Sequence, residues 1–392
     1  MMNIILFDDE RRAHLLPLTF TRPVADLRVG ILTIKEKWER FTKLPVSFLS
    51  QDYLQEKFPL ISKNDNLLIA GSLLPSDELW ESIKALEPGE ALVQQGELLA
   101  ARNVTNNFQT IASAYSIQDY ELKSSRISDL WDIFSQNGQA ISFDFKLLTA
   151  GRISQPIDKT NTVIGNEIFV EEGAKISCSV LNASQGPIYI GKNAEIWEGS
   201  LIRGPFALCE SASVKMGAKI YGATTVGPES RVGGELSNVV IQGYSNKGHD
   251  GFLGNAVLGE WCNIGADSNN SNLKNNYAEV KVWNYPLQRF VSTGLQFCGL
   301  IMGDHSKCGI NTMFNTGTVV GVSANIFGAG FPRNFIPSFT WGGPQGATEY
   351  QLEKAAETAR LVMSRRNKKF DGLEQDIFNK VFELTKSFRQ GG

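Results

Sequence analysis

The stretch IGKNAEIWEGSLIRGPFALCESASVKMGAKIYGATTVGPESRV, residues 190–232, decides the fold because its pattern repeats every six residues. Every sixth position is aliphatic, and the residue four places later is usually small. The aliphatic positions are Ile190, Ile196, Ile202, Leu208, Val214, Ile220, Val226 and Val232. A period of six matches neither an α-helix, which repeats about every 3.6 residues, nor the alternation of a strand. It predicts a three-sided solenoid in which each hexapeptide forms one flat face and one corner, with its aliphatic residue pointing inward.

The same period continues on both sides of this stretch, over residues 164–176, 252–264 and 302–326. Two breaks interrupt it. The first, residues 233–251, contains NKGHDG, and the second, residues 265–301, contains NNSNLKNNYAEVKVWNYPLQRF. Interruptions of a rigid scaffold are common places for function. We therefore expect both breaks to project from the solenoid as loops and the functional site to lie there.

The remaining parts of the chain predict two further regions. Residues 1–150 contain no hexapeptides; MNIILF reads as a buried strand, and TIKEKWERF and SDELWESIKAL read as amphipathic helices, so we expect an α/β domain. The solenoid domain is expected over residues 151–343. Residues 344–392 contain two segments with apolar residues at helical spacing, and we expect these helices to cap the open end of the solenoid.

The overall composition argues against several classes of protein. The net charge of −3 offers no basic surplus for binding nucleic acid. The five cysteines are an odd number without a CxxC pair, which argues against a disulfide framework and against a zinc knuckle. The N-terminus lacks the pattern of a signal peptide, and no apolar run reaches membrane-spanning length. We therefore expect a soluble, cytoplasmic protein.

The N-terminal region resembles the sugar-phosphate nucleotidyltransferases in two places. The strand MNIILF is followed by a loop and by PLTFTRP, where that family has a strand, a GxGxR loop and PLTxxxPK. Further along, NDNLLIAGS stands where the family has a strand that ends in Gly-Asp. The chain departs from the family at the loop glycines, the loop arginine, the PK lysine and the metal-binding aspartate. At these places it has Glu10 and Arg12, His14, Val24 and Ser72.

These departures leave the chemistry of the N-terminal domain open. Nucleotidyl transfer needs positive charge near the phosphates and usually a Mg²⁺ ion. By the resemblance, UTP or dTTP would bind here, with Asp8 and Asp9 as candidate Mg²⁺ ligands. The candidate cations for the phosphates are Arg11, Arg12 and Arg22. Alternatively, the ERR segment opens a solvated helix, and the domain is a docking domain without chemistry of its own.

Together, the two regions resemble the bifunctional UDP-N-acetylglucosamine pyrophosphorylase/glucosamine-1-phosphate N-acetyltransferase family. This resemblance implies that the solenoid is a left-handed parallel β-helix, and that it forms a homotrimer. It also implies acetyl-CoA as the co-substrate and an amino-sugar 1-phosphate as the acceptor. Acetyl transfer to an amine needs a base that keeps the amine neutral and a donor for the developing oxyanion.

The loop histidine fits the requirement for a base. The segment HDGFLGNAVLG followed by CNIGAD aligns without a gap with HLTYLGDAEIG and VNIGAG of the acetyltransferase family. The alignment implies that His249 is the base, that Asn263 binds the substrate, and that the backbone N–H of Ala266 faces the thioester carbonyl. Phe252 stands where the family has a tyrosine, so one hydroxyl contact to the sugar phosphate is missing.

Further candidates come from the same resemblance and from the need of a phosphate for cations and hydroxyl groups. The substrate-binding candidates are Arg203, Arg231, Tyr244, Lys247 and Lys274. The acetyl-CoA-binding candidates, at small-residue positions of the last coils, are Ser306, Thr318 and Ala324. His305 is a second choice for the base, with a structural role at a corner as its alternative. A zinc site of the carbonic anhydrase kind is excluded because His249, His305 and His14 are too far apart in the sequence.

Three functions follow from these observations. The first is acetyl transfer to an amino-sugar 1-phosphate, with His249 as the base. The second is nucleotidyl transfer to a sugar 1-phosphate as the main activity, by way of the altered DDERR loop. The third is a non-catalytic trimeric scaffold that binds a sugar nucleotide, in which case NKGHDG is only a tight turn.

Overall fold

A computed structural model describes residues 2–102 and 116–389 of the chain. These residues form two compact units. The first comprises residues 1–15, 22–27 and 32–129, and the second comprises residues 16–21, 28–31 and 130–392. The helices α5 (Asp132–Ser135) and α6 (Asn137–Thr149), which the sequence analysis places in the N-terminal domain, belong to the second unit. Their polar contacts explain this, because Asn137 Nδ2 donates to the carbonyl of Ala223, 3.0 Å away.

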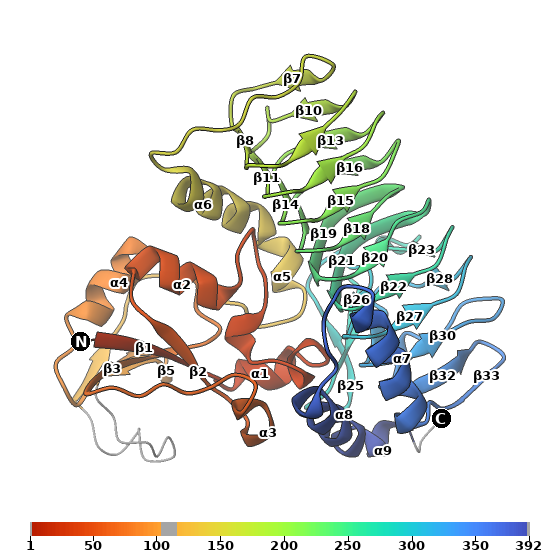
Figure 1. Ribbon diagram of the computed structural model, residues 1–392. Coiled ribbons are helices and arrows are strands. Elements are labelled where there is room, and N and C mark those ends of the chain that lie inside the picture. Colours follow the sequence, from red (N-terminus) through yellow and green to blue (C-terminus); the bar gives the residue numbers. More distant parts are fainter. Residues whose placement is uncertain (1, 103–115, 390–392) are drawn as a thin grey trace. The chain divides into compact units, whose positions relative to one another are not determined.

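The first unit is an α/β domain built on one mixed sheet with the strand order β2-β1-β3-β5-β4-β6. The neighbours of β1 are parallel to it, whereas β5 is antiparallel to both β3 and β4. The strands are β1 (Met2–Phe7), β2 (Val46–Leu49), β3 (Asp65–Ala70), β4 (Glu90–Gln94), β5 (Glu97–Arg102) and β6 (Ser116–Asp119). The helices are α1 (Arg11–His14), α2 (Ile34–Thr42), α3 (Asp52–Gln55) and α4 (Asp77–Lys84). The predicted α/β fold is thus confirmed (Figure 1).

Local sequence signals explain where the two longer helices of this unit begin. Thr33 accepts a hydrogen bond from the N–H of Glu36, whose side chain in turn accepts one from the N–H of Thr33. This capping box satisfies N–H groups that have no partner within the helix. Ser76 caps α4 in the same way through the N–H of Leu79. Trp38 of α2 is buried, and its indole N–H donates to the carbonyl of Leu73 at 2.9 Å.

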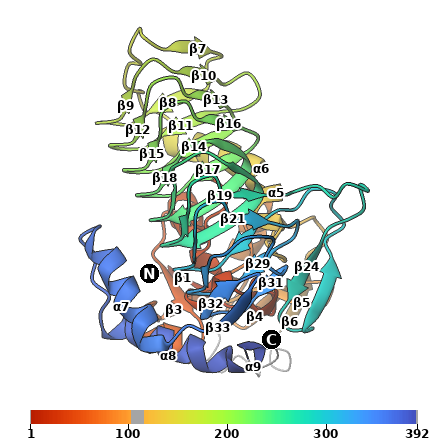
Figure 2. The same ribbon diagram turned by 90° about the vertical axis from the view of Figure 1, so that its right-hand side faces the viewer.

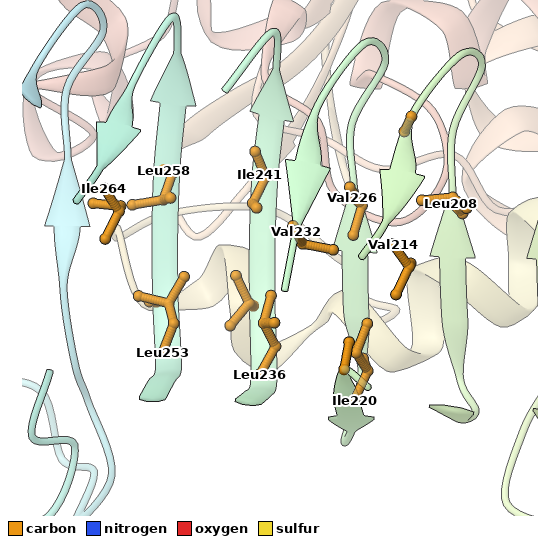
Figure 3. Packing of buried hydrophobic residues seen from close by; sticks show 14 of the residues in the cluster. Leu208, Val214, Ile220, Val226, Val232, Leu236, Ile241, Leu253, Leu258 and Ile264 are labelled. Atoms are coloured by element: carbon orange, nitrogen blue, oxygen red, sulfur yellow. The ribbon is translucent and has the colours of Figure 1, made fainter. Parts of the chain in front are cut away.

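The second unit is a parallel β-helix whose coils stack with the register that the hexapeptide period predicts. Ile190 pairs with Leu208, and Leu208 pairs with Val226, so equivalent residues lie 18 positions apart, which is three hexapeptides. Figure 3 shows the aliphatic side chains of successive coils gathered in the interior. The three-sided solenoid is therefore confirmed.

Each hexapeptide contributes a short strand to one face of the β-helix. The first face contains β7 (Thr162–Ile164), β10 (Val180–Asn182), β13 (Leu201–Arg203) and β16 (Lys219–Tyr221). The second contains β8 (Ile168–Val170), β11 (Ile188–Ile190), β14 (Phe206–Leu208), β17 (Thr224–Val226), β26 (Ile301–Met302), β29 (Val319–Val320) and β31 (Phe335–Ile336). The long strands β19 (Glu235–Gly243) and β21 (Phe252–Glu260) join these two faces, because Leu236 pairs with Ile220 and Ile241 pairs with Val226.

The third face carries the candidate site. Its strands are β9 (Lys175–Ile176), β12 (Glu195–Ile196), β15 (Ser213–Val214), β18 (Arg231–Val232), β20 (Asn246–Lys247), β22 (Asn263–Ile264), β27 (Lys307–Cys308), β30 (Asn325–Ile326) and β32 (Thr340–Gly343). Two further strands, β23 (Asn269–Asn270) and β28 (Met313–Phe314), pair with each other. The antiparallel strand β33 (Gly346–Glu349) pairs with β32 at the end of this face.

The two breaks in the repeat differ in structure. The second break carries the antiparallel hairpin β24 (Lys281–Asn284) and β25 (Arg289–Ser292). The expectation that the first break also projects is wrong, because its NKGHDG segment contains β20, which pairs with both β18 and β22. Lys247 pairs with Val232 and so takes the position that an inward aliphatic residue has in other coils. The first break is therefore a coil of altered sequence.

The C-terminal helices only partly follow the expectation that they cap the end of the β-helix. They are α7 (Leu352–Ser364), α8 (Gly372–Leu384) and α9 (Lys386–Arg389). Phe388 of α9 packs on Phe335 of the last coils, and Figure 2 shows α8 and α9 beside β32 and β33. Arg366, just after α7, instead donates to Asn246 in the middle of the third face, at 3.3 Å. The end of α7 therefore lies beside the third face of the β-helix and not at its open end. No described helix has the length and apolar character needed to cross a membrane.

The inward aliphatic column should respond to the loss of a single methylene. We expect Ile220→Val to lower the free energy of unfolding by about 0.5–1.5 kcal/mol, because Ile220 is 1% exposed and the substitution leaves a small void. Chemical denaturation checks this value. The matched control is Ile153→Val, which should stay within about 0.5 kcal/mol because Ile153 is 92% exposed. Equal effects of the two substitutions would contradict the assignment of Ile220 to the core.

Candidate active site

A pocket of 670 Å³ lies against the third face of the β-helix. Its floor comes from strands β18, β20, β22 and β27, and its side from the end of α7. Five residues of the sequence prediction line it together, although they are spread over 36 positions: Arg231, Tyr244, His249, Asn263 and Ala266. The stacking of coils brings them together, because neighbouring strands of a sheet lie about 4.8 Å apart.

His249 reaches the pocket from the turn after β20. Its side chain is exposed, and it lines the pocket next to Gly248. The backbone of this turn is held from inside the β-helix, since Lys247 Nζ donates to the carbonyl oxygens of His249, at 2.5 Å, and Asp250, at 3.2 Å. The turn that presents the imidazole is thus fixed by a cation beneath it.

Lys247 is an unusual residue for the interior of a β-helix because it is 1% exposed. Burial lowers the pKa of its ammonium group to about 8, and the carboxylates of Asp250 and Asp267 partly oppose this shift. Lys247 does not line the pocket. Unlike Arg231 and Tyr244, it therefore cannot contact a substrate in the pocket directly. Its hydrogen bonds instead hold the backbone of the His249 turn.

Three more candidates on the third face line the pocket close to His249. Asn263 is exposed on β22, and Ala266 follows two residues after that strand, with its carbonyl accepting from the N–H of Asn311 at 2.8 Å. Arg231 is exposed on β18, where it pairs with Asn246, and Asn246 pairs in turn with Asn263. An imidazole, an amide and a guanidinium group therefore lie on successive coils of one wall.

Tyr244 belongs to a column of rings at one corner of the β-helix. Its ring stacks on Trp261 with centroids 4.3 Å apart, and Trp261 stacks on His305 at 6.1 Å. All three residues have a left-handed backbone, with φ between 52° and 62°. We call Tyr244, Trp261 and His305 the corner ladder. Phe378 of α8 packs edge-on against His305 at 5.0 Å, which anchors the C-terminal helices to the ladder.

The two candidate bases differ in their surroundings. His305 is 6% exposed, packed between Trp261 and Phe378, and does not line the pocket. His249 is exposed and lines it. Of the two candidate bases, His249 thus lies at the pocket, whereas His305 is packed at a corner of the β-helix.

Several predicted residues lie away from the pocket. Arg203 is exposed on β13, on the first face. Lys274 lies in the second break, where its Nζ donates to the carbonyl of Glu279 at 2.7 Å. The acetyl-CoA candidates Ser306, Thr318 and Ala324 have side chains that are at most 1% exposed. The Ser306 hydroxyl, for example, donates to the carbonyl of Gly321 and accepts from the N–H of Ala324, so it holds a corner together.

The sequence analysis missed most of the positive charge of the pocket. The additional cations that line it are Lys215, Lys307, Arg365 and Arg366. Arg366 Nη1 lies 3.8 Å from a carboxylate oxygen of Glu229, and Lys215 Nζ lies 3.4 Å from the centre of the Trp197 ring. The run SRRNKK, residues 364–369, was the available signal. Cations at the end of a helix also suit its dipole, so the run alone does not indicate a site.

These cations affect one another. The pKa of Lys215 is lowered, first by burial and then by the charge of Arg231. The pKa of Arg366 is lowered by the same two causes in the same order, whereas Glu229 opposes the shift. Lys307 Nζ donates to the carbonyl of His305, and burial lowers its pKa to about 8. The pocket therefore concentrates like charges, which is typical of a site for an anion.

The predicted residues of the first unit are occupied by contacts within that unit. Asp8 accepts from Ser50 Oγ at 2.5 Å and from the N–H of Val24 at 2.8 Å, and Arg12 lies 3.1 Å from it. Asp9 accepts from the N–H of Arg11 at 3.0 Å and from the hydroxyl of Ser72. Burial is the main cause that raises the pKa of both aspartates, despite these donors.

The arginines of the first unit also have partners there. Arg11 pairs with Glu97, which also pairs with Arg126. Arg12 donates to the hydroxyl of Tyr53 at 2.8 Å, and Arg22, which is 5% exposed, lies 3.4 Å from Asp26. Within residues 2–102 and 116–389, no group of three or more His, Cys, Asp or Glu side chains is arranged to hold a metal ion. Each of the four carboxylate oxygens of Asp8 and Asp9 accepts a hydrogen bond or an ion pair from a group of the protein.

Comparisons with known proteins find similarity to sugar nucleotidyltransferases and to bifunctional proteins at low identity. Residues 4–153 match the family model described as sugar nucleotidyl transferase. Over 191 residues, the chain is 26% identical to a bifunctional sugar-1-phosphate nucleotidylyltransferase/acetyltransferase of Sulfurisphaera tokodaii, which covers 48% of this chain and 47% of that protein. Over 273 residues, it is 29% identical to the bifunctional protein GlmU of Methanocaldococcus jannaschii, which covers 68% of this chain and 57% of that protein. The chain thus spans about half the length of these curated relatives.

Among solved structures, the chain is similar to the UDP-N-acetylglucosamine acyltransferase from Campylobacter jejuni. The match covers 59% of this chain and 83% of that chain, with 15% identity and a TM-score of 0.29. The predicted resemblance to the bifunctional nucleotidyltransferase/acetyltransferase family is confirmed at low identity by the curated relatives and the family model.

Proposed function

We propose that the protein transfers an acetyl group from acetyl-CoA to the amine of an amino-sugar 1-phosphate, as a step in sugar-nucleotide biosynthesis. One observation carries this proposal: His249, Asn263 and Ala266 line a single pocket whose other polar groups are mostly cations. The names of the curated relatives support both the acetyl transfer and a nucleotidyltransferase half. The acceptor phosphate belongs at Arg231, on the strand next to β20.

The reaction follows from the chemistry of the residues in the pocket. The lone pair of the neutral amine forms a bond to the thioester carbonyl carbon, and the imidazole of His249 takes a proton from the nitrogen as this bond forms. The N–H of Ala266 donates to the carbonyl oxygen as negative charge develops on it. The carbon–sulfur bond then breaks as the carbonyl re-forms, and the leaving sulfur of coenzyme A receives from His249 the proton that came from the amine. Asn263 holds the sugar so that its amine faces the thioester.

A homotrimer is part of the proposal. In it, a neighbouring β-helix covers the acetyl-CoA side of each pocket. Ser306, Thr318 and Ala324 are each at most 1% exposed as whole residues, so they offer almost no surface to the arm of coenzyme A. Measuring the molar mass of the protein in solution by light scattering tests this point, since a monomer with full activity would contradict it.

The direct test of the function is a thiol assay. The protein is mixed with acetyl-CoA and glucosamine-1-phosphate, and the released thiol is titrated over time. We expect thiol release that depends on the sugar and an N-acetylated product by mass spectrometry. N-acetylglucosamine-1-phosphate, which has no free amine, is the matched control substrate. Equal thiol release with both sugars, or none with either, would contradict the proposal.

The match of residues 4–153 favours a second activity, nucleotidyl transfer to a sugar 1-phosphate in the first unit. UTP or dTTP would supply the nucleotide, and Mg²⁺ would neutralise the phosphates. Asp8 and Asp9 would be the ligands of the ion, and they would have to exchange some of their hydrogen bonds to Ser50, Val24 and Ser72 for it. The test is pyrophosphate release from UTP or dTTP with a sugar 1-phosphate, with and without Mg²⁺. If neither activity is found but a sugar nucleotide binds, the protein is a binding scaffold.

A further inference from the structure

Gly248 leaves bare backbone in the pocket, directly before the candidate base His249. It lines the pocket, and it follows Lys247, which occupies an inward position paired with Val232. Because side chains alternate between the two faces of a strand, a side chain at position 248 would point outward, into the pocket. The absence of a side chain here therefore adds to the space beside the imidazole.

The coils on either side of Gly248 also have glycines at the same position, namely Gly233 and Gly265. These two are required by the stacking of the coils. A Cβ at Gly233 would lie 2.6 Å from the carbonyl oxygen of Gly248, and a Cβ at Gly265 would lie 2.4 Å from the backbone of Gly309. Atoms cannot pack so closely, so neither position has room for a side chain.

Gly248 differs from both neighbours because the fold does not require it. A Cβ at Gly248 would have no atom of any other described residue within 4 Å, its two chain neighbours aside. Its backbone does not have the positive φ that favours glycine. At such a position, an alanine would stabilise the protein by restricting the unfolded chain. A further reason for glycine is the close approach of another molecule to the backbone.

The order of the coils indicates which molecule approaches Gly248. Arg231, where the proposed function places the acceptor phosphate, lies in the coil on one side. Ala266, whose N–H is proposed to donate to the thioester oxygen, lies in the coil on the other side. Neighbouring strands lie about 4.8 Å apart, so these two levels are roughly 10 Å apart. The sugar ring, which joins the phosphate to the amine beside His249, is the part of the acceptor that lies between them.

We infer that Gly248 determines which acceptors the pocket admits, because the sugar ring lies against its bare Cα. The inference rests on the proposed function for the positions of the phosphate and the thioester. An added methyl group at position 248 would take up the space of the ring. It would leave the cations of the pocket and the packing of the β-helix unchanged.

Substitution of Gly248 in the full chain tests this inference by binding alone. Calorimetric titration should show that Gly248→Ala weakens the binding of glucosamine-1-phosphate about tenfold, and that Gly248→Val weakens it further. The affinity for inorganic phosphate should stay the same in both variants, because no cation is changed. The melting temperature of Gly248→Ala should stay constant or rise.

Two other glycines supply the controls. Gly372→Ala, at the first residue of α8, should not change the affinity, since a Cβ there also meets nothing within 4 Å and Gly372 does not line the pocket. Gly233→Ala should lower the melting temperature, because its Cβ would meet the backbone of Gly248. Unchanged affinity for glucosamine-1-phosphate in both Gly248 variants would overturn the inference. So would a fall in the melting temperature of Gly248→Ala as large as that of Gly233→Ala.

Steady-state kinetics separates this inference from the proposed function. In Gly248→Ala, KM for glucosamine-1-phosphate should rise about tenfold, whereas KM for acetyl-CoA and the pH dependence of kcat should not change. A rise in KM for acetyl-CoA alone would place the donor at Gly248 and overturn the inference. Unchanged kinetics would overturn it as well and leave the proposed function standing.

The binding data also cover the case in which the proposed function is wrong. If the unmodified protein binds glucosamine-1-phosphate but does not acetylate it, the proposed function fails. Weaker binding by Gly248→Ala would then still support the contact between Gly248 and the sugar ring. If glucosamine-1-phosphate does not bind to the unmodified protein, the inference and the proposed function both fail.

Discussion

Replacing His249 with alanine is expected to lower kcat/KM for acetyl transfer by about 10²- to 10⁴-fold, because the amine then loses its proton acceptor. The side chain of His249 is exposed, so the melting temperature should remain unchanged. Steady-state thiol release, together with thermal denaturation, measures both quantities. Activity that stays within a factor of two of the original would remove His249 as the base.

The two other histidines supply matched controls for this substitution. His305→Ala should lower the melting temperature, because it removes a ring packed between Trp261 and Phe378. His14→Ala, at a half-exposed residue of the first unit near Asp129, should affect neither the melting temperature nor acetyl transfer. If His305→Ala abolishes activity while the protein stays fully folded, the assignment of the two histidines must be reversed.

Replacing Lys247 with methionine is expected to lower kcat/KM by about 10- to 100-fold, although Lys247 does not line the pocket. The His249 turn then loses the ammonium group that holds two of its carbonyls, and small displacements of a catalytic group are costly. The melting temperature should stay constant or rise, because an apolar side chain suits the buried position better than a charge. Lys219→Met, at an exposed lysine of β16, is the control and should change neither quantity.

The pH dependence of this variant gives a sharper test. Burial lowers the pKa of Lys247 to about 8 in the folded protein, below its value of about 10.4 in the unfolded chain. The charged form therefore costs folding free energy below pH 8, and this cost disappears as the pH rises toward 10.4. Any stabilisation by Lys247→Met should be largest below pH 8 and fade as the pH rises from 8 to about 10.4. Activity of the unmodified protein should fall as the pH rises through 8, and a variant that keeps the same fall would show that another group causes it.

The sequence predicted the β-helix well because its fold depends on a local and repeated signal. Each hexapeptide specifies its own face and corner, and the register of Ile190, Leu208 and Val226 follows from counting. The same counting brings His249, Asn263 and Ala266 to one wall once the alignment is made. The coil that carries His249 was predicted to be a projecting loop, because Lys247 occupies an inward position that is aliphatic in the other coils.

The cations of α7 could not be placed from the sequence for a different reason. Their position depends on long-range packing of α8, whose Phe378 meets His305 and Phe339. Neither contact has a local signal, and a basic run at the end of a helix has an ordinary explanation in the helix dipole. In the first unit, the sequence identified the strands β1 and β3 and the helices α2 and α4. It did not reveal that Asp8 accepts hydrogen bonds from Ser50 and Val24, or that Asp9 accepts one from Ser72.

The stacking of β15, β18 and β20 also limits how such a site can evolve. Residues at equivalent positions of successive coils are separated by whole multiples of the spacing between neighbouring strands, so the distances between them are fixed. A point substitution changes the side chain at one of these positions, but it does not change the spacing between the coils. A longer acceptor would require a cation on the next coil, or the duplication of one whole coil of 18 residues. The spacing of the existing coils would stay the same.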